Sequence, residues 1–511
     1  MTTAVTHLWR LLKWGRTLAR HGALGGIERD PLTPPGVRRL VKLARFGTRQ
    51  PAEPDYAHAL QAIGPAAIKL GQALATRPDL VGEKAAHNLL RLQDSLPPAP
   101  FPLIRHAIEQ ALEAPLERLF AEFDEVAIGA ASIAQVHRAV TTEGRQVAVK
   151  VLRPGIEDEF TRALETYEWA AAQAEKFGGE FQRLRPQSVI AQFRQWTRRE
   201  LDLNREAASA SELKQNMVAE PGFYVPEIDW RRSARRVMTL EWLDGIKLSK
   251  RDQLIAAGHD LTQLAATLVR AFLRQAVIDG FFHADLHQGN LFALPDGRIA
   301  AIDFGIMGRV DRRARRWLAE ILYGLITGNY ERVAEIHFEA QYVPAHHNIA
   351  EFTTALRAVG EPIRGLAVKE ISVGRMLEGL FTITRDFEMP TQPHLLLLQK
   401  TMVMEEGVAT FLDPEINMWE TAEPFLREWI RDELGPEAYA ADRLIHWVRT
   451  FKKLPDLVDR IDHYFPAPGA APPPLPQAQV EVVGLPGLRF KDVALAALGA
   501  AGGALAVFLL S

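Results

Sequence analysis

The chain has 511 residues, which is too long for one simple domain but fits one large body with appended segments. With 47% hydrophobic residues, 24% charged residues and a net charge of −3, the composition is that of a globular protein and does not indicate nucleic-acid binding. The absence of cysteine excludes disulfides, thiolate zinc sites and a cysteine nucleophile, and the 15 histidines show no HExxH-type spacing that would predict zinc.

Residues 1–50 form a basic N-terminal region, in which the only acidic residues are Glu28 and Asp30. Within "HLWRLLKWGRTLAR" the apolar residues Leu8, Leu11, Leu12 and Leu18 share one helical stripe. The basic residues Arg10, Lys13 and Arg20 lie opposite this stripe. Such a helix is typical of binding to an anionic membrane surface, at about 1 kcal/mol per basic residue. A helix packed on its own domain is an equal alternative. A mitochondrial presequence is disfavoured, because such segments are Ser-rich and the first serine here is Ser95.

Residues 51–120 are predicted to be helical. The stretch "AAIKLGQALATRP" is an apolar helix interrupted only by Lys69 and Gln72. A lysine buried in such a helix needs a carboxylate partner, whereas a lysine at the helix edge would extend to water.

Residues 121–245 begin with strand-like runs, "GRQVAVKVLRP" and "RRVMTLEWLDG". In the first, "VAVK" makes Lys150 the candidate for binding the α- and β-phosphates of a nucleotide from a strand. Residues 127–139, "AIGAASIAQVHRA", precede it where a kinase-like enzyme has a Gly-rich phosphate loop, although only Gly129 remains and alanine dominates. A plain β-hairpin of small residues is the alternative. The predicted ATP-binding residues of this loop are Ala130, Ala131, Ser132, Ile133, Ala134 and Gln135.

The stretch "RRELDLNREAA" offers a carboxylate for Lys150 on one predicted helix. Asp202 and Glu206 are i, i+4 neighbours, whereas Glu200 and Glu206 are about 600° apart in rotation and point different ways. We therefore predict that Glu206 pairs with Lys150, leaving Glu200 and Asp202 for another cation. A salt-bridged surface helix is the alternative reading.

In "MTLEWLDG" the sequence resembles a hinge strand, whose backbone groups near Glu241 and Leu243 would bind adenine.

The strongest signal is "FFHADLHQGNLFALPDGRIAAIDFG", residues 281–305. Asp285, Asn290 and Asp303 have the intervals of the HxDxxxxN loop and DFG element of kinase-like enzymes, with a strand before Asp303. Asn290 and Asp303 would hold Mg²⁺ on nucleotide phosphates, because Mg²⁺ prefers hard oxygen ligands. Asp285 would accept the proton of an attacking hydroxyl or water.

After Gly305 the chain soon enters a basic helical stretch, residues 309–325, without a long activation segment or an Ala-Pro-Glu sequence. Protein kinases seat peptide substrates on that segment, so this pattern does not predict an ordinary protein kinase. Strands followed by helices predict an α+β body.

The C-terminal residues predict a membrane anchor behind a Pro/Ala-rich linker. Residues 493–510 are uncharged and, as a helix, would extend about 27 Å, close to the hydrocarbon thickness of a bilayer. Arg489 and Lys491 precede this run and predict a cytoplasmic main body. Gly499 and Gly503 form a GxxxG motif, which permits helix–helix packing and hence a homodimer.

Taken in order, these motifs resemble the UbiB family, atypical kinase-like proteins tied to ubiquinone biosynthesis. "KLGQ" resembles the family's KxGQ signature, "AASIAQVHRA" its Ala-rich loop, and "ELD" its ExD element. Gln288 stands where proline is common, and Gly129 departs from an all-alanine loop start. The resemblance implies an atypical protein-kinase-like bilobal α+β fold with an N-terminal helical extension, and ATP and Mg²⁺ as cofactors.

The resemblance further implies that the KxGQ helix lies over the place where a protein substrate would enter, with Lys69 and Gln72 directed toward Glu200 and Asp202 in a regulatory role. The expected activity is an auto-inhibited ATPase of ubiquinone synthesis at the bacterial inner membrane. The expected partners are membrane lipid, prenylated quinone intermediates and quinone-biosynthesis proteins, and no nucleic acid. A small-molecule kinase of the choline or aminoglycoside type and a non-catalytic, nucleotide-gated lipid-binding scaffold are the alternatives. No flavin or metal-oxygenase motif supports a ring hydroxylase.

The predicted organisation has six parts: a basic amphipathic region (1–50), a KxGQ helical extension (51–120), an N-lobe with inserted helices (121–245), a helical C-lobe (246–460), a linker (461–490) and a transmembrane helix (491–511).

Overall fold

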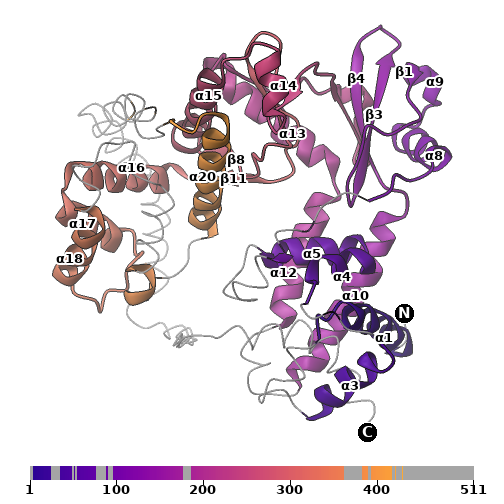
Figure 1. Ribbon diagram of the computed structural model, residues 1–511, viewed down its shortest axis with the longest axis horizontal. Coiled ribbons are helices and arrows are strands. Elements are labelled where there is room, and N and C mark those ends of the chain that lie inside the picture. The colour runs from indigo at the N-terminus through magenta and orange to yellow at the C-terminus, as the bar shows by residue number, and fades with distance from the viewer. Residues whose placement is uncertain are drawn as a thin grey trace, which may run out of the picture. The chain divides into compact units, whose positions relative to one another are not determined.

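The computed structural model describes residues 4–24, 35–48, 51, 54–75, 88–89, 92, 96–176, 186–361, 383–389, 393–416, 421 and 429. The described residues form two compact units (Figure 1). Unit 1 takes its described residues from Met1–Ala208 and Glu227–Trp242, and unit 2 takes its described residues from Ser209–Pro226 and Leu243–Val483. One division therefore falls between Trp242 and Leu243, in the segment that the sequence predicted as a hinge. Ser209–Pro226 belongs to unit 2, whereas the sequence analysis kept residues 121–245 together.

Unit 1 combines an antiparallel sheet with helices. The strand order is β1-β3-β4-β6, with β2 paired to β3. Its elements are α1 (Ala4–Arg20), α3 (Pro35–Arg45), α4 (Tyr56–Ile63), α5 (Pro65–Ala75), α8 (Phe101–Leu112), α9 (Leu116–Leu119), β1 (Phe120–Phe123), β2 (Gly129–Ala130), β3 (Ala134–Thr141), β4 (Gln146–Leu152), α10 (Ile156–Glu175), α12 (Pro186–Glu200), the first residues of α13 (Leu203–Asn216), the 3₁₀ turn η2 (Trp230–Arg232) and β6 (Val237–Glu241).

The alternation of β4 decides which face of the sheet carries Lys150. Val147, Val149 and Val151 are buried in one cluster with Ile104 of α8, which lies beside the sheet in Figure 1. Because successive side chains of a strand point to opposite faces, Lys150 lies on the other face. Its pairing partners on the neighbouring strands are Val136 and Met238. The hydrophobic pattern of the strand thus excludes Lys150 from the core beneath the sheet.

The N-terminal helix packs within unit 1. Leu11 of α1 is buried against Ala170 of α10, and Leu18 is buried with Val41. His7 Nδ1 also lies 3.1 Å from Thr166 Oγ1 of α10. The predicted apolar stripe is therefore only partly right, because Leu12 is 37% exposed. Of the two alternatives that the sequence left open, the structure has the helix packed on its own unit.

Unit 2 contains two small sheets surrounded by helices. Strands follow the order β5-β10-β9-β7, with β5 parallel to β10, and β8 pairs with β11. Its elements are the rest of α13, η1 (Met217–Ala219, 3₁₀), β5 (Phe223–Tyr224), β7 (Ile246–Lys247), α14 (Arg251–Ala256), α15 (Leu261–Leu273), the π-helix η3 (Arg274–Asp279), β8 (Phe281–His283), β9 (Leu291–Ala293), β10 (Ile299–Ala301), β11 (Met307–Arg309), α16 (Arg312–Thr327), α17 (Tyr330–Glu339), α18 (Ile349–Gly360) and α20 (Pro393–Leu412).

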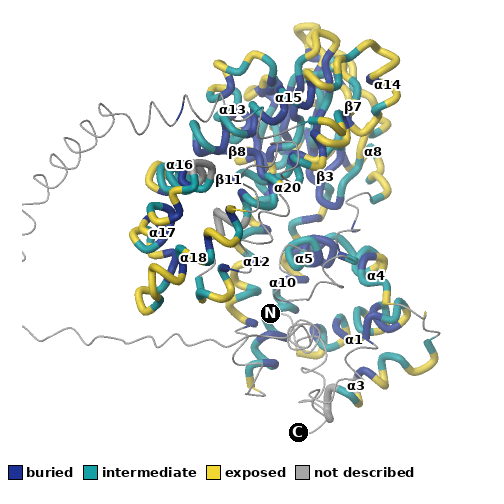
Figure 2. Tube along the Cα trace, turned by 60° about the vertical axis from the view of Figure 1, so that its left-hand side comes forward, coloured by how far each residue is buried: buried dark blue, intermediate teal, exposed yellow. Residues whose placement is uncertain are grey.

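The β8–β11 ribbon holds both ends of the predicted catalytic stretch. Phe282 is fully buried and lies opposite Gly308, where an added Cβ would stand 2.1 Å from the phenyl ring. Only glycine at position 308 leaves room for this ring. His283 is thereby paired with Met307 and brought beside the residues that follow Asp303. Figure 2 shows α15 and β8 in the buried interior of the unit.

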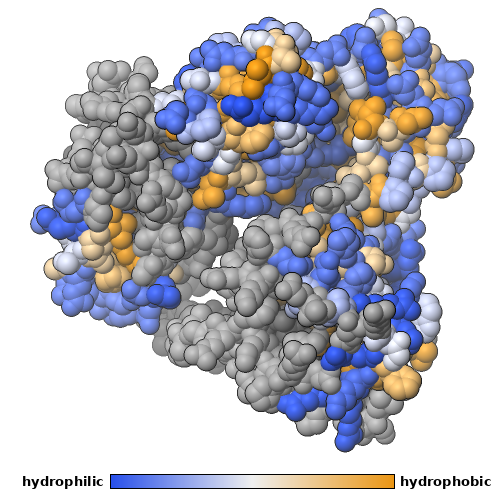
Figure 3. All heavy atoms as spheres, viewed as in Figure 1, coloured by the Kyte–Doolittle hydropathy of each residue, from blue (hydrophilic) through white to orange (hydrophobic). Residues whose placement is uncertain are grey.

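The α+β body agrees with the sequence, whereas the predicted anchor lies outside the described residues, as does the linker at 461–490. Among the residues that the structure describes, no helix combines the length and the apolar character needed to span a bilayer. On the face in Figure 3, the described residues are mainly hydrophilic, and hydrophobic residues gather only in small groups.

Candidate active site

Hydrogen bonds join the three residues that the sequence predicted for phosphate chemistry. The Asp285 N–H donates a hydrogen bond to His283 Nδ1 at 3.1 Å, and His283 Nε2 is hydrogen-bonded to the carbonyl oxygen of Asp303. Asn290 Nδ2 donates to the Asp285 carbonyl at 3.3 Å. The N–H of Ile302 donates to the Asn290 carbonyl at 3.1 Å. Asp285, Asn290 and Asp303 therefore belong to one connected loop within unit 2.

His283 is the centre of this loop, and its protonation state follows from its partners. Because Nδ1 accepts a hydrogen bond from a backbone N–H, the ring proton lies on Nε2, which donates to Asp303. Burial lowers the pKa of His283, and the hydrogen bond to the Asp303 backbone opposes that shift. A neutral imidazole thus fixes the backbone of Asp285 relative to that of Asp303.

The side chains of Asn290 and Asp303 fit a magnesium ion. The Asn290 amide donates through Nδ2, which leaves the oxygen Oδ1 as the atom that can bind a cation. Asp303 Oδ1 accepts the Gly305 N–H at 3.0 Å, which orients the carboxylate. One amide oxygen and one carboxylate are the hard donors that Mg²⁺ takes from protein when nucleotide phosphates and water complete its shell.

Lys400 is a member of this site that the sequence analysis missed. It comes from α20, and its Nζ lies 3.9 Å from Asp285 Oδ1. The only sequence signal is a lysine within the apolar run "LLLLQKTMVM". A single lysine in a helix has no characteristic spacing, so only the fold reveals its neighbour.

In unit 1, Lys150 and Glu206 form the ion pair that the sequence predicted. The distance from Lys150 Nζ to Glu206 Oε1 is 2.6 Å, and both side chains are mostly buried. In kinase-like enzymes, a carboxylate at this position holds the strand lysine in place for the phosphates.

A second buried pair joins Lys69 of α5 to Glu200 of α12. The distance from Lys69 Nζ to Glu200 Oε1 is 2.6 Å, and the amine lies 5.9 Å from the centre of the Trp196 ring. Gln72 is half-buried, and among the described residues no hydrogen bond joins it to Asp202. Lys69 and Glu200 therefore make the expected contact between the KxGQ helix and the ExD element.

The single helix predicted over "RRELDLNREAA" is wrong. Helix α12 ends at Glu200, and α13 begins at Leu203. The Asp202 side chain accepts the Asn204 N–H at 3.2 Å, as aspartate does at the start of a helix. The i, i+4 argument for Asp202 and Glu206 assumed continuous helical rotation, which this break interrupts.

The alanine-rich segment is a tight hairpin formed by β2 and β3. The Ala131 N–H donates to the Ala134 carbonyl at 2.8 Å, and Arg153 binds the carbonyls of Ala131 and Ile133. Ser132, Ile133 and Ala134 are buried, whereas Ala130 and Ala131 are half-buried. Arg153 thus fixes the tip of the hairpin. Both readings of the sequence, a nucleotide loop and a plain hairpin, fit this conformation.

Gln135 was predicted to bind ATP, but its side chain is hydrogen-bonded to other residues of unit 1. Its Oε1 accepts the Ala99 N–H at 2.7 Å, and its Nε2 lies 2.8 Å from His137 Nε2. The side chain is buried and joins β3 to the segment before α8. In this conformation Gln135 is not available to a nucleotide.

The predicted hinge begins at the end of β6. The Glu241 N–H donates to the Glu227 carbonyl at 2.8 Å, and its carboxylate accepts the Glu227 N–H at 3.1 Å. The backbone N–H and the side-chain carboxylate of Glu241 are therefore both hydrogen-bonded within unit 1. Leu243 is half-buried and is the first residue of unit 2 after this strand.

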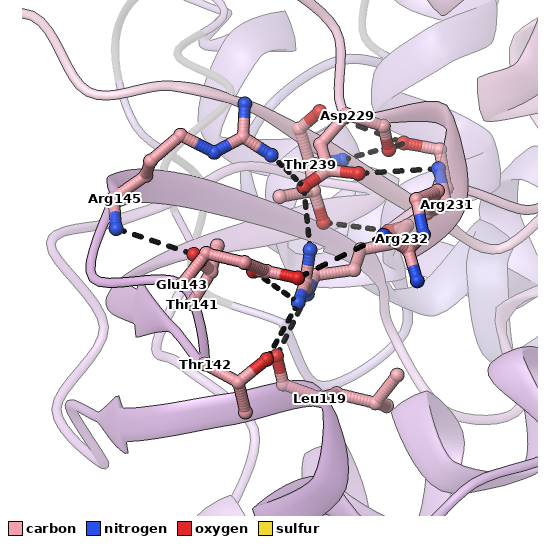
Figure 4. A network of polar contacts seen from close by, with 10 residues as sticks. Leu119, Thr141, Thr142, Glu143, Arg145, Asp229, Arg231, Arg232 and Thr239 are labelled. Carbon is pink, nitrogen blue, oxygen red and sulfur yellow. Dashed lines mark hydrogen bonds and ion pairs between the residues drawn. The ribbon is translucent and has the colours of Figure 1, made fainter.

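A buried arginine fixes the turn between β3 and β4, the strand that carries Lys150. The Arg232 guanidinium donates to Asp229 Oδ2 at 2.9 Å, to Glu143 Oε2 at 2.6 Å and to the Leu119 carbonyl at 2.7 Å (Figure 4). Thr142 accepts a further bond at 3.0 Å. This network joins η2 to the β3–β4 turn, and its charges are paired, as burial requires.

Two family models match this chain. Residues 91–337 match the ABC1 atypical kinase-like domain, and residues 356–417 match the UbiB helical domain. The chain belongs to the UbiB family. The loop of Asp285, Asn290 and Asp303 lies within the first match, as does the Lys150–Glu206 pair. Lys400 lies within the second match, whereas Lys69 precedes both.

Solved structures also resemble this UbiB-family chain. One is the complex of Rv3197 with erythromycin from Mycobacterium tuberculosis, which is 26% identical in sequence. The alignment covers 71% of this chain and 93% of that chain, with a TM-score of 0.46.

Proposed function

We propose that this chain is a membrane-anchored, Mg-ATP-dependent atypical kinase-like ATPase that supports ubiquinone synthesis, acting on lipid intermediates or on the biosynthetic complex. The observation that carries the catalytic part is the hydrogen-bonded loop that joins Asp285, Asn290 and Asp303. Membership of the UbiB family supports the quinone part.

In this proposal each residue of the loop has its own task. Asn290 and Asp303 hold Mg²⁺, which neutralises phosphate charge when it is bound. Asp285 accepts the proton of the attacking water or hydroxyl. His283 keeps the backbone of that aspartate in register with Asp303. Lys400 holds the Asp285 carboxylate from the helical domain and adds a positive charge near the site of phosphoryl transfer.

Lys150 is the proposed phosphate-binding residue of unit 1. Glu206 accepts its hydrogen bond and so directs the amine, which would otherwise be a flexible point charge. The Lys69–Glu200 pair is proposed to regulate activity, because it ties the N-terminal extension to α12.

The acceptor is proposed to be water or a lipid rather than a peptide. After Gly305 the chain forms the short strand β11 and then enters α16 at Arg312, so no long segment intervenes on which a peptide could be seated. The same feature is compatible with a small-molecule kinase. The Lys69–Glu200 contact, which such kinases are not expected to have, favours the ATPase.

The test is Asp303→Asn, measured both in the purified protein and in the producing strain. Removing one metal-binding carboxylate should lower ATP hydrolysis at least about a hundredfold. In the strain, ubiquinone should be lost and an early prenylated precursor should accumulate. Asp296→Asn is the matched control, because Asp296 is exposed in the turn between β9 and β10 and, within the described part of the chain, its side chain binds only Arg298.

Each alternative gives its own outcome in this test. Unchanged hydrolysis by Asp303→Asn would contradict the catalytic assignment, and normal ubiquinone in that strain would reject the pathway. Transfer of the labelled γ-phosphate to a soluble metabolite would favour a small-molecule kinase. Restoration of quinone synthesis by a variant lacking both Asp285 and Asp303 would favour the lipid-binding scaffold.

A further inference from the structure

Three potential metal ligands meet in unit 2, apart from the residues proposed for ATP and Mg²⁺. His346 and His347 lie in the loop between α17 and α18, and Glu388 lies in the segment that follows residue 383. One ligand atom from each residue lies within 4.8 Å of the other two.

The two segments meet because both are anchored in one hydrophobic core. The Phe387 ring packs on Phe352 of α18 at 4.9 Å and on the His347 ring at 5.3 Å. Ile383 is buried in the same cluster as Phe352. On the loop side, the Asn348 side chain caps α18 by accepting the Ala350 N–H at 2.8 Å. Packing on one side and the helix cap on the other therefore hold the three side chains together.

The spacing of the three residues suits a small cation. Glu388 Oε2 lies 3.4 Å from His346 Nε2 and 4.0 Å from His347 Nε2. A tetrahedral ion with bonds of about 2.0–2.1 Å separates its ligand atoms by about 3.3–3.4 Å. The first distance already matches this value. A small rotation of the Glu388 side chain, which is 64% exposed, can close the second.

A buried nitrogen indicates that the cluster does more than pair charges. His347 Nε2 is inaccessible to solvent and has no hydrogen-bond partner among the described residues. Its separation of 4.0 Å from Glu388 Oε2 is too long for a hydrogen bond. Burying such an unsatisfied group is unfavourable. An ion pair between His346 and Glu388 would leave this nitrogen unsatisfied, whereas a metal ion would satisfy it.

We infer that His346, His347 and Glu388 form a binding site for a divalent transition-metal cation of the zinc class. Two imidazole nitrogens and one carboxylate oxygen are donors that suit Zn²⁺, whereas Mg²⁺ prefers oxygen donors alone. Water would take the remaining position, because His346 and Glu388 reach the surface. The sequence could not reveal the site, because the adjacent histidines and the glutamate lie far apart in the chain.

The site would link the two parts of the chain that the family models match. The histidines lie between these matches, and Glu388 lies inside the helical one. A bound ion would tie the loop before α18 to the segment that precedes α20. Its expected effect is to stabilise the helical domain, because an ion that binds only the folded state raises its stability.

The experiment uses tag-free full-length protein that has been stripped with a chelator and then kept in millimolar Mg²⁺ without nucleotide. Titration with Zn²⁺ should give one equivalent of bound metal and raise the apparent melting temperature. Glu388→Gln and His346→Ala should each weaken the zinc affinity at least about tenfold and reduce the thermal shift. His347→Ala should do the same, and the two exposed variants keep the test valid if His347→Ala unfolds.

Two controls complete the design. His106→Ala removes an exposed histidine of α8 and should leave zinc binding unchanged. Asp303→Asn should also retain zinc binding, so that the zinc site and the proposed ATPase are tested separately. Absence of stoichiometric zinc in the wild type would overturn the inference. Equal zinc binding by Glu388→Gln, His346→Ala and the wild type would also overturn it.

Discussion

Units 1 and 2 both place lysines beside carboxylates, but the pairs differ in distance and burial. Unit 1 has two pairs at 2.6 Å whose side chains are at most 14% exposed, Lys150–Glu206 and Lys69–Glu200. In unit 2, Lys400 Nζ lies 3.9 Å from Asp285 Oδ1, and these side chains are 35% and 29% exposed.

This difference separates fixed groups from groups that can change partners. Breaking a buried ion pair leaves an unpaired charge in a low-dielectric environment, which is unfavourable. Both side chains of such a pair therefore keep their positions. A longer, partly exposed pair is screened by water and contributes at most about 1 kcal/mol. Separating Lys400 from Asp285 therefore costs little, as the proposed role of Asp285 in accepting a proton from a substrate requires.

The largest expected effect comes from breaking a buried pair in unit 1. Glu200→Met leaves Lys69 buried without its carboxylate and should lower the apparent free energy of unfolding by about 3–5 kcal/mol. The double variant Lys69→Met/Glu200→Met should recover most of that loss, because no charge remains. Urea denaturation of the four proteins of the cycle measures both effects. A double variant as unstable as Glu200→Met would show that the ion pair is not the cause.

For the Lys400–Asp285 pair of unit 2, we expect a smaller effect on stability and a separate effect on the catalytic rate. Lys400→Met should change the free energy of unfolding by less than about 1 kcal/mol and leave ATP affinity unchanged. It should lower kcat about tenfold, equivalent to about 1.4 kcal/mol of barrier, because a cation near the transferring phosphoryl group is lost. Lys400→Arg should restore most of this rate.

Lys250→Met is the control for this variant, since Lys250 is exposed just before α14. Steady-state kinetics and denaturation of the same preparations separate the two properties. A loss of stability as large as that of Glu200→Met, or an unchanged kcat, would remove the distinction between the two kinds of pair.

Residues whose chemistry requires short, fixed intervals along the chain could be predicted from the sequence. Asp285, Asn290 and Asp303 stand at fixed intervals on adjoining elements. In the structure His283 joins Asp285 to Asp303, and Asn290 is hydrogen-bonded directly to Asp285. The pairing of Lys150 with Glu206 was also found, because a strand lysine in such an enzyme requires a carboxylate. The α+β fold followed from strands preceding helices.

Contacts between segments that lie far apart in the chain could not be predicted from the sequence. Nothing in the sequence places Lys400 beside Asp285, or Glu388 beside His347, because packing of whole helices and loops creates those contacts. A local hydrogen bond also made one prediction wrong. Asp202 accepts the Asn204 N–H, and the helix that the sequence predicted as continuous is interrupted at this point. In α1, the burial of His7 rotates the packed face away from Leu12.

The proposed function requires that ATP binds through a metal ion and Lys150. Calorimetric titration of ATP into full-length wild type and Lys150→Met, each with and without Mg²⁺, tests it most directly. We predict that the wild type binds ATP with Mg²⁺ and that Mg²⁺ removal or Lys150→Met weakens binding at least about tenfold, because a charge-assisted contact is lost. Wild-type affinity that is independent of Mg²⁺, or unchanged in Lys150→Met, would show that ATP does not bind through a metal ion and Lys150.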